Sequence, residues 1–168
     1  MVVIRSALFI YRCGGIIYAM LEQLTRREQL IWLACFIDTD GSISLTYTRF
    51  PYYYPTIMFG QKTDALLTEI MMHFDRVIWQ DKEHRKSGTM EIKMFGTHTR
   101  DLLEQLIPFL VLKRRQAQIC IDYANYLKLR DRRPRGDTGL DEEQKEMIIE
   151  IRKLNARKSG KWNKPRLE

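Results

Sequence analysis

The chain has few cysteines and few histidines, and this scarcity excludes the sites that those residues usually build. Its 168 residues include Cys13, Cys35, Cys120, His73, His84 and His98. The cysteines are odd in number, far apart and set in apolar surroundings, so we expect reduced thiols in an intracellular protein and no disulfide framework. Neither residue type shows the spacing of zinc ligands, which argues against a zinc site.

The chain also lacks an uninterrupted apolar segment. Residues 1–20 are largely apolar, but Arg5, Arg12 and the pair Gly14 and Gly15 interrupt them, so they do not predict a membrane-spanning helix. No small-residue cleavage site follows a clean apolar core, so a signal peptide is not expected. We interpret residues 1–20 as an added strand or hairpin.

The charge balance favours a polyanionic partner. Lysine and arginine number 28 against 21 aspartates and glutamates, which gives a formal net charge of +7. Apolar residues make up 45% of the chain, enough for one sizeable core. We therefore expect a single compact domain that binds nucleic acid and not a membrane.

The most informative segment, residues 33–43, is an apolar helical run that ends in two carboxylates and a glycine. Thr25 followed three residues later by Glu28 forms a capping box, and residues 26–37 contain neither glycine nor proline, so a helix is predicted to start near Thr25. One of its faces carries small side chains that suit close contact with another helix, including a second copy of itself. That face comprises Ile31, Ala34, Cys35 and Asp38.

The remaining pattern predicts an α+β domain. We expect two strands over 43–59, a helix over 63–74, a strand pair at 77–81 and 90–95, and helices over 99–110, 113–130 and 141–157. This order places the helices on one face of an antiparallel sheet and leaves the other face uncovered.

The uncovered face is predicted to carry hydrogen-bonding and basic groups that suit base edges in a DNA major groove. Its members are Ser44, Thr46, Thr48, Tyr52, Tyr54, Thr56, Gln80, Lys82, Glu91 and Lys93. The solvated face of an ordinary antiparallel sheet shows the same alternation, so the pattern needs support from other features. Basic clusters outside the sheet, Arg115 among them, are expected to hold phosphates.

Residues 33–41 read Leu-Ala-Cys-Phe-Ile-Asp-Thr-Asp-Gly and resemble the motif of the LAGLIDADG homing endonucleases. Two further segments are similar to that family. They are residues 60–63, which open a helical segment, and residues 106–117, where a Pro-Phe-Leu run precedes Lys113. Cys35 departs from the glycine that is usual in the family. The motif occurs once, which identifies the chain with the single-motif subfamily over residues 26–128.

The resemblance implies a helix, two strands, helix, two strands, helix core at residues 25–130, whose sheet forms a DNA-binding saddle. Residues 1–24 would be an N-terminal extension, and residues 131–168 a basic loop, helix and tail of the same domain. It also implies a homodimer that cuts both strands of a long, partly palindromic DNA site beside an intron or intein, located with the host DNA in the cytoplasm, nucleoid or an organelle.

The resemblance further implies the roles of four residues. Asp40 of each chain would meet its symmetry mate, and Asp40 with the backbone carbonyl of Thr39 would bind Mg²⁺, at a site that Mn²⁺ or Ca²⁺ can also occupy. Gln61 would orient the attacking water, and Lys113 would supply positive charge to the transition state. No small-molecule cofactor is implied.

Other interpretations stay open at the level of sequence. A protein of the same fold could bind DNA without cutting it, or act as an RNA maturase. Residues 36–42 also resemble the loop of haloacid-dehalogenase phosphatases, with Asp38 as nucleophile, but that loop follows a buried strand and this segment follows a capped helix. Asp38 could instead bond backbone amides, and Gly41 is expected to serve a backbone bend.

Overall fold

The structure is a computed structural model, and it describes residues 20–49, 52–61, 64–74, 78–79, 90–95, 97–130 and 139–156. The elements are α1 (Met20–Gln23), α2 (Arg26–Thr39), β1 (Gly41–Arg49), β2 (Tyr52–Gln61), α3 (Asp64–His73), β3 (Ile78–Trp79), β4 (Met90–Phe95), α4 (Thr97–Leu106), α5 (Arg114–Arg130) and α6 (Glu142–Ala156). This order confirms the predicted α+β class. The hairpin predicted at residues 1–20 falls almost wholly outside the described residues, and the basic tail lies outside them.

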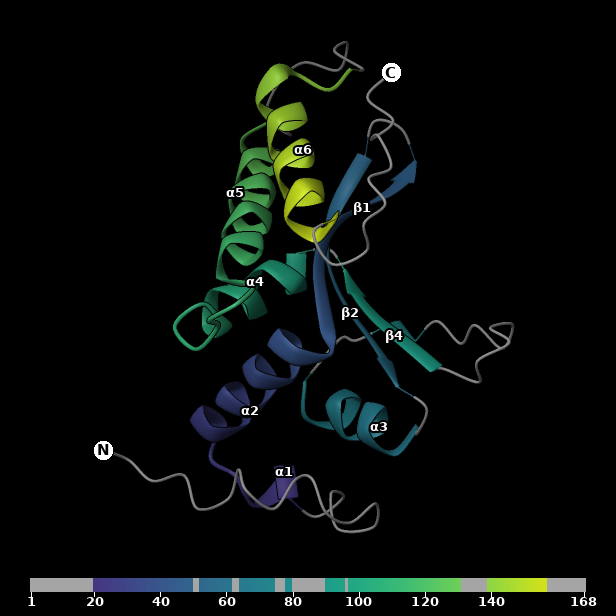
Figure 1. The fold of residues 1–168 in the computed structure, drawn as a ribbon, viewed down its shortest axis with the longest axis vertical. Helices are drawn as coiled ribbons and strands as arrows, with labels where there is room; N and C mark the ends of the chain where they lie inside the picture. Colours follow the sequence, from purple (N-terminus) through teal and green to yellow (C-terminus); the bar gives the residue numbers. More distant parts are fainter. Residues whose placement is uncertain are drawn as a thin grey trace.

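The four strands form one antiparallel sheet in the order β1-β2-β4-β3. Side chains alternate along each strand, and one face is buried under the helices. That face carries Ile43, Leu45, Ile57, Phe59, Ile92 and Met94. Figure 1 shows α2, α4, α5 and α6 along one side of β1 and β2. The prediction of helices on one face of the sheet is confirmed.

Helix α2 begins where the capping box predicts. The backbone amide of Glu28 donates to the Thr25 hydroxyl, and the Thr25 amide donates to Glu28 Oε2 at 2.9 Å. Toward its other end, Phe36 stacks on Trp32 and on Phe59 of β2, with ring centroids 5.6 and 5.3 Å apart. Helix α2 is therefore packed directly on the sheet.

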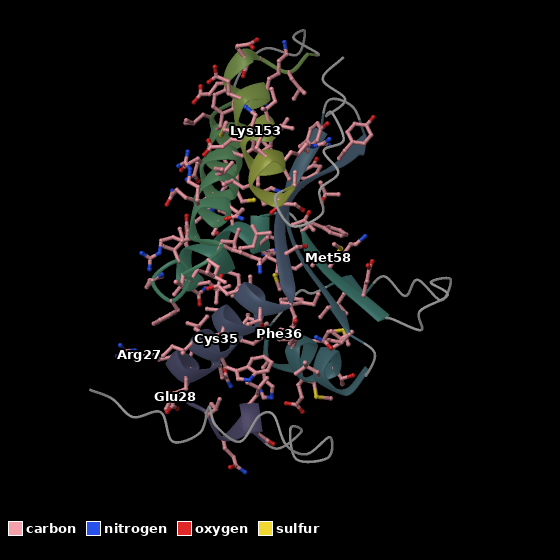
Figure 2. The ribbon with its side chains drawn as sticks, in the orientation of Figure 1. Arg27, Glu28, Cys35, Phe36, Met58 and Lys153 are labelled. Atoms are coloured by element: carbon pink, nitrogen blue, oxygen red, sulfur yellow. The ribbon has the colours of Figure 1, made fainter. Side chains whose placement is uncertain are left out.

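The face of α2 that is predicted to contact another helix is partly buried within its own chain and partly accessible. Ala34 is fully buried in the core of its own chain and Asp38 is 7% exposed, so the prediction that these two residues lie in a dimer interface is wrong. The reason is that α2 packs against both β1 and α4, which widens its buried stripe. Ile31 is half-buried and Cys35 is exposed, and Figure 2 shows Cys35 on the side of α2 away from the strands.

Both ends of the described chain pack on the central elements. Leu21 of α1 is 1% exposed, and its carbonyl accepts a hydrogen bond from Gln29 Nε2 at 2.8 Å. At the other end, Asn155 Nδ2 of α6 donates to the carbonyl of Ile43 at 2.9 Å. Within the described ranges, no helix combines the length and the apolarity that crossing a bilayer requires.

Candidate active site

The junction between α2 and β1 places Asp40 at the surface. Asp40 caps the C-terminus of α2, its amide donates to the carbonyl of Phe36 at 2.9 Å, and its side chain is exposed. Gly41 then opens β1. A Cβ atom on Gly41 would lie 2.9 Å from Ile37 Cα and 3.3 Å from Cδ1 of Phe59. Glycine is needed here because the two backbones approach so closely, which is a more specific reason than the expected bend.

In contrast to Asp40, Asp38 is buried and hydrogen-bonded. Its Oδ2 accepts hydrogen bonds from the backbone amides of Val111 at 2.7 Å and Leu112 at 3.1 Å, and its Oδ1 accepts from the amide of Lys113 at 2.9 Å. These amides precede α5, where a carboxylate satisfies backbone donors that lack a helical partner. Asp38 therefore bonds backbone amides, and its occupied oxygens rule out the nucleophile of the phosphatase interpretation.

Lys113 lies beside the end of α2, far in sequence but close in space to the residues that lead to Asp40. It is 5% exposed, and its Nζ donates to the carbonyls of Ile37 at 2.5 Å and Asp38 at 2.6 Å. These are among the last carbonyls of α2, where a positive charge offsets the negative end of the helix dipole. The ammonium group is directed at the protein backbone.

The strand register brings Gln61 to the same end of the sheet as Asp40. Gly41 pairs with Phe59, and Gln61 lies two residues farther along β2, opposite Met90 of β4. Its side chain is half-buried. Thr39 is exposed, and its hydroxyl is used inside the helix, where it donates to the carbonyls of Cys35 and Phe36.

The donor set at this junction fits a divalent cation only in part. Of the two carboxylates that end the motif, Asp40 is exposed and Asp38 is already bonded. Within the described ranges, no group of three or more His, Cys, Asp or Glu side chains could hold a metal ion. Because Mg²⁺ takes six oxygen ligands, one chain supplies part of a site that a second chain, a phosphate and water would have to complete.

Six of the predicted DNA-contacting residues alternate with the core residues and so share the opposite face of the sheet. Thr46 pairs with Tyr54, Ser44 pairs with Thr56, and Lys93 and Glu91 lie on β4. Figure 2 labels Met58, which pairs with Lys93 on this face. We call this set the open face.

Accessibility differs within the open face. Tyr54 is 36% exposed, and Ser44, Thr46 and Lys93 are half-buried. Thr56 and Glu91 are only 1% and 3% exposed, so their prediction as direct DNA contacts is wrong. The Thr56 hydroxyl donates to the carbonyl of Tyr54 at 3.1 Å, and Glu91 lies 4.0 Å from the ammonium of Lys93. The side chains of Thr48, Tyr52, Gln80 and Lys82 lie outside the described part of the chain.

Arg115 does not belong to the open face. It lies on α5, on the helical side of the sheet, and its Nε and Nη2 donate to the two carboxylate oxygens of Glu150 at 2.7 and 2.9 Å. These bonds raise the pKa of the Arg115 guanidinium. Its predicted contact with phosphate would therefore have to compete with an ion pair to α6.

Solved structures with the same arrangement are homing endonucleases. I-CvuI, in complex with its target and Ca, has a TM-score of 0.55 and 23% identity, over 83% of this chain and 85% of that one. The archaeal intron-encoded I-Vdi141I, complexed with DNA, has a TM-score of 0.53 and 16% identity, over 78% and 99%. The chain has the LAGLIDADG homing endonuclease fold. No protein-family model and no curated protein matches the sequence.

The LAGLIDADG homing endonuclease fold occurs among these structures in chains of two sizes. The chain covers 85% of I-CvuI and 99% of I-Vdi141I. It covers only 45% of the meganuclease I-SmaMI, whose structure is bound to uncleavable DNA. That match has a TM-score of 0.53 and 15% identity over 82% of this chain. Its length is therefore that of one unit of the fold, as a single motif predicts.

Sequence reasoning missed two exposed apolar residues of this fold. Val111 and Leu112 are 77% and 68% exposed at the turn that Asp38 holds. They continue an apolar run, and that pattern alone favours burial. Their position follows from the hydrogen bonds to Asp38, which join residues too far apart in sequence for periodicity to reveal.

Proposed function

We propose that this protein is a site-specific DNA endonuclease of the homing type, which hydrolyses both strands of a long, partly palindromic site with Mg²⁺. The proposal includes association with an intron or intein and action on host DNA inside the cell. The observation that carries it is the exposure of Asp40 at the end of α2, at the same end of the sheet as Gln61. The open face beside it supplies polar side chains for a duplex.

A homodimer would complete the site. One exposed carboxylate is too few for a hydrolytic cation site, and a second copy would bring its own Asp40 to the first. The apolar surface near the end of α2 supports this arrangement, since Ile31 and Cys35 lie on its outer side and Val111 and Leu112 are exposed at the adjoining turn. Burial of such side chains stabilises an interface.

Each residue of the junction has a definite task in this proposal. Asp40 and the Thr39 carbonyl would hold Mg²⁺, and a bound divalent cation supplies Lewis-acid stabilisation and an activated water. Gln61 would orient that water by hydrogen bonding. Ser44, Thr46 and Tyr54 would contact base edges, and Lys93 would contribute positive charge toward the phosphates.

To test the proposal, duplexes that bind the protein are selected from a randomised library. The bound duplexes are then incubated with Mg²⁺ or with EDTA. We expect Mg²⁺-dependent double-strand cleavage by the wild type and a rate lower by about 10³-fold in Asp40→Asn. Asp122→Asn, which neutralises an exposed carboxylate of α5, serves as the matched control. Cleavage by Asp40→Asn at the wild-type rate contradicts the role of Asp40. Tight binding without cutting identifies the DNA-binding alternative, and selective binding of RNA identifies the maturase alternative.

A further inference from the structure

Two buried charged side chains join the end of α2 to the start of α5 in both directions. Asp38 reaches from α2 to three amides that precede α5, and Lys113 reaches back to two carbonyls of α2. The side chains are 7% and 5% exposed. We call this pair the clasp.

The clasp matches each charge to the helix end that stabilises it. A carboxylate is favourable at the N-terminal end of α5, and an ammonium group is favourable at the C-terminal end of α2. Both ends carry backbone groups without helical partners, and the two side chains satisfy them. Removal of either member leaves buried backbone groups at this junction unsatisfied, so both side chains support the same contact between α2 and the turn before α5.

The clasp is connected to Asp40 through one turn of backbone. Lys113 holds the carbonyl of Ile37, and Gly41 packs so closely on Ile37 that a Cβ atom there would lie 2.9 Å from Ile37 Cα. Asp40 lies between these points, with its amide bonded to the carbonyl of Phe36. Any displacement of the Ile37 carbonyl therefore displaces the backbone that carries Asp40.

We propose that Asp38 and Lys113 form one positioning unit for the carboxylate of Asp40. Lys113 acts on cleavage through this placement, while its ammonium group stays on the α2 carbonyls and does not contact the phosphate. This inference rests on the proposed function, because it assigns Lys113 the task of supporting Asp40, whose carboxylate would bind Mg²⁺.

Hydrogen exchange in the free protein tests the clasp without reference to nuclease activity. In Lys113→Met and in Asp38→Asn, we expect exchange of the Asp40 amide to accelerate by about tenfold or more, because the last turn of α2 opens locally. Lys128→Met removes an exposed charge of α5 and serves as the control. Lys113→Gln, which keeps a donor, replaces Lys113→Met if that variant fails to fold. Wild-type exchange at Asp40 in the Lys113 variant overturns the proposal.

Single-turnover cleavage of a duplex selected by the wild type separates positioning from direct catalysis. We expect the Mg²⁺ concentration for half-maximal rate to rise by about tenfold in both single variants, with the double variant no worse than the more impaired one. The proposal is overturned if Lys113→Met lowers the cleavage rate equally at every Mg²⁺ concentration while Asp38→Asn cleaves like the wild type. Absence of cleavage by the wild type itself counts against the proposed function, while hydrogen exchange still decides whether the clasp positions Asp40.

Discussion

Asp38 and Asp40 stand two residues apart in the motif and have opposite surroundings. The exposure of Asp40 fits its place at the end of a helical run, where the sequence predicted the helix to end. Backbone amides were considered as partners of Asp38, but the sequence could not show which ones, because they lie 73 to 75 residues away in the chain. The same distance hid the orientation of Lys113, whose neighbours in sequence say nothing about the carbonyls that it binds.

The residue after Asp40 yields a stability prediction. Gly41→Ala places a Cβ atom 2.9 Å from Ile37 Cα, a backbone atom that cannot move cheaply. We expect a loss of about 1–3 kcal/mol in the free energy of unfolding, measured by urea denaturation. Gly139→Ala is the matched control, since a Cβ atom there meets nothing within 4 Å. Equal stability of the two variants contradicts the close-packing explanation.

At the scale of elements, local chemistry predicted where α2 begins better than it predicted which residues cover the faces of α2. The capping box placed the start of the helix correctly because both of its bonds are made within four residues. The division of its faces was predicted less well, since a helical pattern shows which side chains share a face and not which neighbour covers it. For that reason Ala34 was assigned to the interface with a partner chain, whereas it lies in the core of its own chain.

The capping box also predicts a pH dependence. Its hydrogen bonds with Thr25 lower the pKa of Glu28 from 4.5, so its stabilisation is present above that value and is lost as the pH falls through the lower folded pKa. We expect Glu28→Gln to unfold at a lower temperature than the wild type at about pH 7 and at nearly the same temperature at about pH 3. Glu146→Gln, an exposed change on α6, should match the wild type at both. A difference for Glu28→Gln that persists at the acidic pH contradicts this origin.

For the whole molecule, the layer arrangement was predictable because strand alternation and helix length are local patterns. The surface that a second copy would cover was only partly predictable. Ile31 and Cys35 follow from the helical period, whereas Val111 and Leu112 depend on a turn that is held from a distant helix. At this turn, tertiary hydrogen bonds thus decide that two apolar side chains are exposed.

The homodimer of the proposed function leads to a matched pair of variants. Leu112 and Leu129 are both 68% exposed, but Leu112 adjoins the end of α2 and Leu129 lies near the end of α5. We expect Leu112→Glu to shift the protein toward monomer in sedimentation velocity, because it places a charge in the interface, and Leu129→Glu to leave the dimer intact. A monomeric wild type, or a dimer unaffected by Leu112→Glu, contradicts this interface.

The stack of Trp32, Phe36 and Phe59 has a mechanical consequence. Phe36 stacks on Trp32 within α2 and on Phe59 of β2, with ring planes inclined by 17° and 13°, so rolling of α2 over β2 would separate the rings of Phe36 and Phe59. Under the proposed function, the strand that would contact the duplex and the helix that ends at Asp40 are therefore joined by a direct aromatic contact. If the protein bends the DNA that it binds, this contact would transmit the bend from β2 to the end of α2, and we expect the shape of the duplex to affect the rate of cleavage.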